Sequence, residues 1–239
     1  MIDIKNLSKS YNKGAIKAVD SLNLHVKQGE IFGFLGPNGA GKTTTIKMMV
    51  GLLNPDSGSI AIKGFDTQKQ TLEAKRNIGY VPDNPDVFDR LTGMEYLNFM
   101  ADVYQMPVET RRERIGSFLE MFELADAASD LIKSYSHGMK QKIVLAGALI
   151  HAPSLWILDE PMVGLDPKSA HMLKELMRKH CDNGNSVFFS THILEVAEKL
   201  CDRIGIINKG KLVAIGSMEE LRKGDQADTL ENIFLELTE

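Results

Sequence analysis

The stretch from Gly36 to Thr44 constrains the fold of this chain more than any other feature of the sequence. It reads Gly-Pro-Asn-Gly-Ala-Gly-Lys-Thr-Thr and fits the pattern G-x-x-x-x-G-K-S/T. An apolar run at 31–35, typical of a buried strand, precedes it, and a segment with a helical pattern at 45–53 follows it. Because strand, glycine loop and helix come in the order that this motif requires, we expect the loop to wrap the phosphates of a nucleotide.

The residue types of this loop suit an anion. Gly36, Gly39 and Gly41 carry no side chain, so the backbone can curl and point its N–H groups at phosphate oxygens. The following helix adds its positive dipole end. Lys42 supplies a charge for the β- and γ-phosphates, and the Thr43 hydroxyl is suited to ligate Mg²⁺. The expected nucleotide-binding set also contains Pro37, Asn38, Ala40 and Thr44. The alternative is a glycine-rich turn that binds nothing.

Composition and charge narrow the class of protein. The chain has 239 residues, of which 43% are hydrophobic and 25% charged, as in ordinary soluble globular proteins. A net charge of -4 gives no global positive field for nucleic acid. The longest apolar run, at 143–150, is far shorter than the roughly 20 residues of a membrane span. Without a signal peptide at its start, and with Cys181 and Cys201 interpreted as reduced thiols, the chain is predicted to be cytosolic.

The order of elements indicates an α/β fold. Helical spacing of apolar residues dominates from about residue 92 to 150, where no convincing strand occurs. We interpret this block as a helical subdomain inserted into an α/β core. The tail at 229–237 also has a helical pattern, and we expect it to pack on the body. Strand patterns occur at 1–26, 59–62, 78–81, 155–158 and 186–190, and a hairpin pattern at 204–215.

Two carboxylates follow one of the buried-strand runs. The run at 155–158 ends in Asp159 and Glu160, and open α/β sheets place their ligands at the carboxyl ends of strands. Asp159 is suited to hold Mg²⁺, directly or through water. Glu160 is suited to accept a proton from an attacking water. Solvated acids at the end of a surface strand are the alternative, and the phosphate loop in the same chain favours the functional interpretation.

The order of these motifs resembles that of the ATP-binding cassette (ABC) ATPases, and the resemblance covers nearly the whole chain. Ser136-His137-Gly138-Met139-Lys140-Gln141 looks like the signature of this family, usually L-S-G-G-Q, which is specific to it. Val163-Gly164-Leu165-Asp166 looks like its D-loop, and Ser190-Thr191-His192 like its switch histidine. Tyr11 falls where the family stacks an aromatic ring on adenine, although it could be a plain surface aromatic.

The resemblance implies an architecture. We expect an α/β fold with a P-loop NTPase core, an antiparallel β subdomain and an inserted α-helical subdomain. A single ABC ATPase domain would then span 1–239, with the core at about 1–91 and 151–239 and the helical subdomain at about 92–150. The family forms a head-to-tail dimer that holds two ATP molecules between its subunits. Each ATP would touch the phosphate loop of one subunit and the signature of the other.

Carried over to this sequence, the family pattern assigns further roles. Ser136 and Gly138 would face the γ-phosphate bound by the partner, and Asp166 would lie at the subunit interface and couple the two sites. Gly138 also opens a predicted helix, whose dipole supports that role independently, whereas Ser136 could be an ordinary N-cap. His192 would hydrogen-bond the γ-phosphate and hold the water near Glu160. The expected catalytic residues are Glu160, His192 and Lys42.

The sequence departs from the family pattern in two places. The signature differs from the common one at Tyr135, His137 and Met139. Asp83, in Tyr80-Val81-Pro82-Asp83-Asn84-Pro85, replaces the usual glutamine, whose neutral amide oxygen serves Mg²⁺. Asp83 would add negative charge close to Asp159 and Glu160, so we expect it to ligate the metal and to change metal affinity or hydrolysis rate. The expected Mg²⁺ ligands are Thr43, Asp83 and Asp159.

The resemblance also implies partners. In transporters of this family a permease docks beside the Q-loop, here Pro85 to Thr92, where Val87, Phe88 and Leu91 could form an exposed apolar patch or anchor the loop to the core. The signature and the segment Leu230 to Leu237 resemble exporter ATPases that work with a separate permease. We therefore predict an ATPase subunit on the inner face of the cell membrane, paired with itself or with a related subunit.

Two other functions are compatible with an ABC ATPase. A soluble member acting on ribosomes or DNA usually carries two cassettes and a charged linker, or coiled-coil or zinc insertions, and the sequence has none of these. A weakly hydrolysing, nucleotide-gated switch is the other alternative, and the presence of both Glu160 and His192 argues against it. The sequence of this chain does not identify the transported substrate, because the permease selects it.

Overall fold

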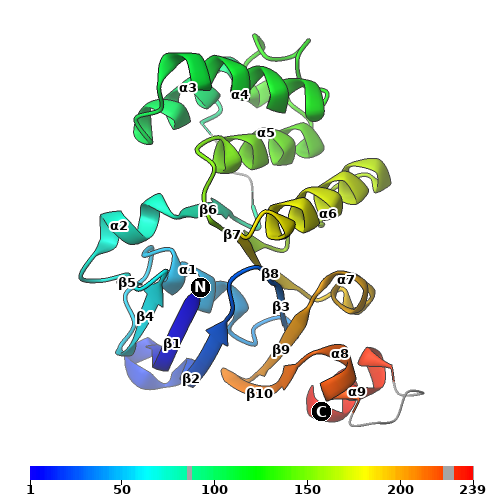
Figure 1. Ribbon diagram of the computed structural model, residues 1–239. Coiled ribbons are helices and arrows are strands. Elements are labelled where there is room, and N and C mark those ends of the chain that lie inside the picture. The colour runs from blue at the N-terminus through cyan, green and yellow to red at the C-terminus, as the bar shows by residue number, and fades with distance from the viewer. Residues whose placement is uncertain (85–87, 223–228, 239) are drawn as a thin grey trace.

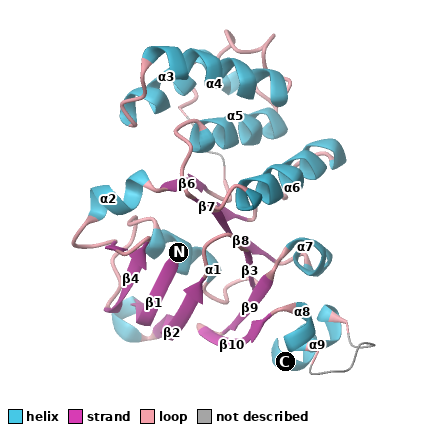
Figure 2. Cartoon of the chain, in the orientation of Figure 1, coloured by secondary structure: helices cyan, strands magenta, loops and turns pink. Residues whose placement is uncertain are grey.

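Two β-sheets and a group of helices set apart from them form the computed structural model, which describes residues 1–84, 88–222 and 229–238. The strands lie in the lower and middle parts of Figure 1, and three helices of the central sequence lie together at the top. Figure 2 shows that helices and strands alternate along the core, whereas the upper group contains helices alone. The predicted α/β fold is confirmed.

The larger sheet is mainly parallel and has the strand order β10-β9-β3-β8-β7-β6. Only β9 and β10 are antiparallel, and they form the predicted hairpin around Asn208 to Gly210. Strands β3, β7 and β8 are buried throughout, which explains their continuous apolar runs. The bounds are β3 (Ile31–Leu35), β6 (Ile78–Val81), β7 (Leu155–Asp159), β8 (Ser186–Thr191), β9 (Arg203–Asn208) and β10 (Lys211–Gly216).

The smaller sheet is antiparallel and has the order β2-β1-β4-β5. Ile2 and Ile4 of β1 face Val26 and Leu24 of β2 in register, so the alternation in the sequence places one apolar face of each strand inward. This sheet is the predicted antiparallel β subdomain. Its strands are β1 (Ile2–Tyr11), β2 (Ile16–Val26), β4 (Ser57–Ile62) and β5 (Phe65–Asp66), with a 3-10 helix at Asn12–Gly14.

The two faces of the larger sheet pack against different hydrophobic cores. Phe32, Phe34 and Phe188 pack with the smaller sheet and with α1 (Lys42–Met49). Ile31 and Phe189 pack on the opposite face, in a core shared with α6 and the helical group. The helices that flank the sheets are α2 (Thr71–Arg76), α6 (Pro167–Asp182), α7 (Leu194–Leu200), α8 (Met218–Leu221) and α9 (Leu230–Thr238).

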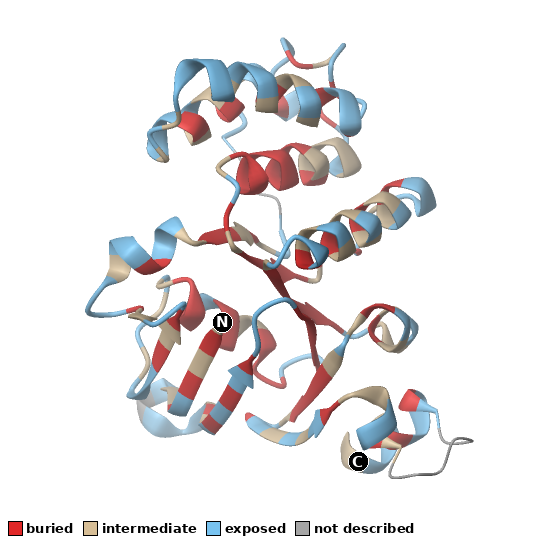
Figure 3. Ribbon diagram, in the orientation of Figure 1, coloured by how far each residue is buried: buried red, intermediate tan, exposed pale blue. Residues whose placement is uncertain are grey.

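The helical group consists of α3 (Gly93–Val103), α4 (Val108–Met121) and α5 (His137–Leu149), with a 3-10 helix at Ile132–Ser134. Thr92 begins α3 with a capping box, because its side chain accepts from the Glu95 amide and the Glu95 side chain accepts from the Thr92 amide. Helix α5 is the buried member of the group (Figure 3), and its apolar residues join the same core as the sheet. No helix in the described ranges is long and apolar enough to cross a bilayer.

Candidate nucleotide site

Two glycines of the loop between β3 and α1, Gly36 and Gly41, are required by their surroundings. A Cβ on Gly36 would lie 2.4 Å from the carbonyl oxygen of Ile207, and one on Gly41 only 2.3 Å from that of Ala18. Gly41 is also the N-cap of α1 at a φ of 112°, where residues with a side chain are strained. At Gly39 a Cβ would project into open space instead. The loop therefore encloses a concavity in front of the N-terminus of α1.

Lys42 directs its charge into this loop. The side chain is buried, and Nζ donates to the carbonyl oxygens of Gly36 at 2.7 Å and Pro37 at 3.3 Å. Nζ also lies 3.5 Å from Oε1 of Glu160. A buried ammonium that is held by carbonyl oxygens and one carboxylate is suited to a polyanionic ligand.

Neighbouring strands bring the predicted acids to the same edge of the sheet. Ser190 of β8 donates its hydroxyl proton to Oδ1 of Asp159 at 2.5 Å, and the Glu160 amide donates to Oγ of Ser190 at 3.0 Å. Glu160 has a φ of 49°, a left-handed conformation that a non-glycine residue keeps only where its surroundings impose it. Ser190 thus fixes the position of both acids, a role that the sequence interpretation did not assign to it.

The remaining oxygen of Asp159 is the main indication of a cation site. Oδ2 is buried and makes no hydrogen bond, and the nearby Thr43 hydroxyl stays outside hydrogen-bond geometry. Burial raises the pKa of Asp159, the hydroxyls of Ser190 and Thr43 oppose the shift, and the charges of Asp83 and Glu160 add to it. Burial, together with the charges of Asp159 and Asp83, also raises the pKa of Tyr80 to about 12.

This donor set fits Mg²⁺. A bound cation would satisfy the unpartnered oxygen of Asp159, and Thr43 and Asp83 line the adjacent cavity. Within the described ranges, no three His, Cys, Asp or Glu side chains are placed to hold a metal alone. Mg²⁺ is usually held by one or two carboxylates together with substrate phosphates, so the acids present are sufficient.

His192 contacts the predicted base directly. Its Nδ1 lies 3.0 Å from Oε2 of Glu160, and the imidazole is about half exposed. Glu160 therefore lies between Lys42 on one oxygen and His192 on the other. The cavity in front of these groups has a volume of about 220 Å³ and is lined by Ala18, Pro37, Asn38, Gly39, Gly41, Lys42, Thr43, Thr44, Asp83 and Glu160.

Six predicted nucleotide contacts do not line this cavity. Gly36 and Ala40 belong to the phosphate loop itself, and the remaining four are Tyr11, Ser136, Gly138 and Asp166. Tyr11 ends β1 and is exposed. Ala18 of β2, which the sequence interpretation did not select, reaches the cavity instead, because its carbonyl oxygen packs on the loop at Gly41. Nothing in the sequence pattern near Ala18 marks it, since its position depends on contacts of β2 with Gly41 and Gly210, which are distant in sequence.

The other three residues lie beside one another elsewhere on the chain. Ser136 is the N-cap of α5, and its Oγ accepts from the Met139 amide at 3.3 Å. This is the ordinary capping role that the sequence analysis gave as the alternative to a phosphate contact. Asp166 caps α6 and accepts from the Ser169 amide at 2.9 Å. Hydrogen bonds from Ser169 lower the pKa of Asp166. The two caps are linked, because Lys142 of α5 lies 3.9 Å from Oδ2 of Asp166.

The His137 ring forms a second link between these segments. A Cβ on Gly164 would lie 2.5 Å from Cδ2 and Nε2 of His137, so the imidazole lies against the backbone of the predicted D-loop. The signature and the D-loop therefore form one surface of the chain, and this surface is separate from the cavity at the phosphate loop.

Comparison with known proteins places the chain among these ATPases. The protein-family model described as ABC transporter matches residues 19–163 of this chain. The linearmycin resistance ATP-binding protein of Bacillus subtilis is 40% identical over 96% of this chain and 73% of its own length. The Nod factor export ATP-binding protein I of Burkholderia orbicola is 36% identical over 92% of this chain and 72% of its own length.

Solved structures give the same result. An ATP-binding subunit of an ABC transporter superposes with a TM-score of 0.94 and 34% identity over the full length of both chains. A dimeric post-hydrolysis cassette bound to ADP and phosphate superposes with a TM-score of 0.83 and 27% identity, over 91% of this chain and 99% of that one. The chain therefore belongs to the ABC transporter family, as an ATP-binding subunit that hydrolyses ATP.

Proposed function

We propose that the chain works as half of a head-to-tail dimer that closes on two ATP molecules. One observation carries this proposal: the phosphate cavity is lined by the loop, Asp83 and Glu160, whereas the signature lies on a different surface. The N-terminus of α5, at Ser136 and Gly138, presents backbone N–H groups outward and can complete the site of a second subunit. A solved relative is dimeric and holds ADP and phosphate, which supports a nucleotide-bound dimer.

Within such a site, different residues bind the phosphates, hold the metal and activate the attacking water. The loop amides and Lys42 bind the phosphates, while Thr43, Asp159 and Asp83 would hold Mg²⁺, which neutralises charge on the phosphate oxygens. Glu160 accepts the proton of the attacking water, and His192 orients the carboxylate from 3.0 Å.

The chain powers export through a separate membrane permease in this proposal. The names of two relatives refer to drug resistance and to export. Pro85 to Val87 lie outside the described residues, but the remainder of the proposed docking segment carries two apolar side chains, Phe88 and Leu91, beside an open groove. Phe88 and Phe99 are both exposed, with ring centroids 5.4 Å apart, and they line a groove with Leu91. This position would hold the subunit at the cytoplasmic face of the membrane.

Affinity purification from detergent-solubilised membranes tests this function. We expect the wild-type chain to recover an integral membrane protein, and Phe99→Glu to lose it, since a carboxylate in an apolar contact must be desolvated. Leu72→Glu is the matched control, because Leu72 is an exposed leucine on α2, outside the groove. Recovery of ribosomes or DNA without a membrane protein would contradict the proposal.

A further inference from the structure

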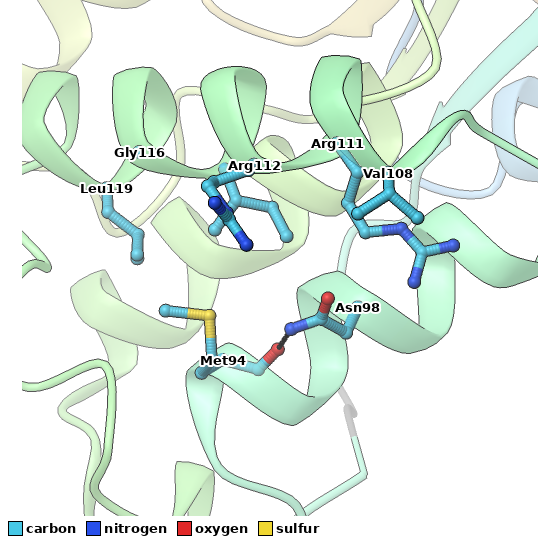
Figure 4. A pocket seen from close by; sticks show the side chains of 8 residues that line it. Met94, Asn98, Val108, Arg111, Arg112, Gly116 and Leu119 are labelled. Atoms are coloured by element: carbon cyan, nitrogen blue, oxygen red, sulfur yellow. Dashed lines mark hydrogen bonds between the residues drawn. The ribbon is translucent and has the colours of Figure 1, made fainter.

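A second cavity lies in the helical group, on elements that the nucleotide site does not use. Its volume is about 470 Å³, and its walls come from α3 and α4. Figure 4 shows the two helices facing each other across it, with α4 above and α3 below. The lining residues are Met94, Asn98, Val108, Arg111, Arg112, Ile115, Gly116 and Leu119.

The cavity combines apolar walls with a free positive charge. Met94, Val108 and Leu119 provide much of the apolar surface. Arg112 extends from α4 into the space between the helices (Figure 4) and forms no ion pair within the described ranges. No carboxylate is part of the lining. Cavities of this size with apolar walls and a few convergent polar groups are typical of small-ligand sites.

Arg111 also lines the cavity. One of its terminal nitrogens is 2.5 Å from Oδ1 of Asp102, which holds the side chain in place. Its Nε is buried and has no hydrogen-bond partner.

A side chain at position 116 would project into the cavity. Gly116 lies within α4, where glycine is unfavourable relative to alanine. Its φ is not positive, and a Cβ built on it would meet no atom within 4 Å. Neither backbone conformation nor packing therefore requires glycine here. The open space at this position belongs to the cavity, since Gly116 lines it.

We propose that the cavity between α3 and α4 binds an anionic amphiphile, a molecule with an alkyl chain and an acidic head group. The alkyl chain would lie against Met94, Ile115 and Leu119, and the head group would accept from Arg112. Charge-assisted hydrogen bonds of this kind are stronger than neutral ones, so the site should select for charge as well as for chain length.

Titration with monomeric dodecanoate, followed by NMR and calorimetry, tests the proposal. We expect saturable binding of dodecanoate and none of dodecyltrimethylammonium, which has the same chain and the opposite charge. Arg112→Glu should weaken binding by at least about tenfold. Gly116→Leu should abolish it by filling the cavity, while Gly116→Ala should retain it and report that the fold is intact. Arg76→Glu, an exposed arginine on α2, is the charge control.

Several outcomes would overturn the assignment. Equal binding of the cationic and anionic probes would show that the site does not select for negative charge. Dodecanoate binding that survives Gly116→Leu would show that dodecanoate does not bind in this cavity. Binding to phosphatidylglycerol vesicles without any binding of free dodecanoate would assign the arginines to a membrane surface. Loss of a co-purifying protein in Gly116→Leu, again without dodecanoate binding, would assign the cavity to a protein partner.

Discussion

Asp83 adds a carboxylate to the mouth of the nucleotide cavity, and its charge raises the pKa of the nearby Asp159. We predict that Asp83→Gln raises the Mg²⁺ concentration for half-maximal ATP hydrolysis, because a carboxylate attracts the cation more strongly than an amide. The change should be roughly tenfold or less, as expected for one ligand charge. Steady-state ATPase assays across a Mg²⁺ series measure it, with Asp126→Asn, an exposed acid elsewhere, as control. Unchanged metal dependence and turnover would refute the role of Asp83.

Single residues of the candidate site differed in how far the sequence could predict them. Lys42 and Glu160 follow directly from their motifs, since each motif fixes a local backbone that delivers its side chain. The contact between Lys42 and Glu160, and the hydroxyl of Ser190 that joins the two acids, depend on strands far apart in sequence. Tyr11 was selected by family position alone, and its contact with adenine stays a prediction.

At the scale of elements, His151 follows α5 and contacts both α3 and β6. Its ring stacks on Tyr104 at the end of α3, and Nε2 lies 3.1 Å from the carbonyl oxygen of Ile78 in β6. Burial lowers the pKa of His151 to about 4, and the charge of Arg114 adds to the effect. The folded pKa lies below the unfolded value, so the unfolded state binds the extra proton. This residue therefore reduces stability as pH falls from about 6.5 to about 4.

Replacing His151 with Phe keeps a ring for the stack and removes the titration. Between pH 7 and 4.5 we expect the free energy of unfolding of His151→Phe to fall less than that of the wild type, by at most about 3 kcal/mol. Urea unfolding at a series of pH values measures the difference. His171→Gln, on the exposed face of α6, should behave as the wild type. Parallel pH profiles for His151→Phe and the wild type would disprove this effect of burial.

Long elements were easier to predict than short ones. The strands around the phosphate loop and helices α3 to α5 have apolar residues at regular spacing, and the predicted strands and the predicted helical block at 92–150 match them. The elements that were not predicted are β5, α2, α7 and α8. Each has seven residues or fewer, too few for a period to stand out. Helix α1 also begins at Lys42 rather than at 45, because the loop itself supplies its first turn.

The whole molecule presents two surfaces that a single chain does not bring together. The phosphate cavity is built from β2, the loop after β3, α1 and the chain segments that follow β6 and β7, whereas the signature and D-loop lie at the starts of α5 and α6. Motif order revealed both surfaces, but only the strand order and the helix positions show that they are separate. A dimer with head-to-tail symmetry would pair each cavity with the signature surface of the partner.

Mixing two inactive variants tests this pairing. Lys42→Ala removes the charge that the loop carbonyls hold, and Gly138→Asp places a carboxylate where the partner's phosphate should bind. Position 138 can accept a side chain, since a Cβ there would be 3.9 Å from the nearest atom, the carbonyl oxygen of Gly164. A heterodimer of the two variants would contain one site with an intact loop and an intact signature.

An equal mixture of the two variants should therefore recover about one quarter of wild-type ATPase activity, because half of the dimers are mixed and each has one good site of two. Each variant alone should remain inactive while eluting as a folded protein. An inactive mixture in which mixed dimers are detected would show that both defects act within one subunit, and the head-to-tail arrangement would then be wrong.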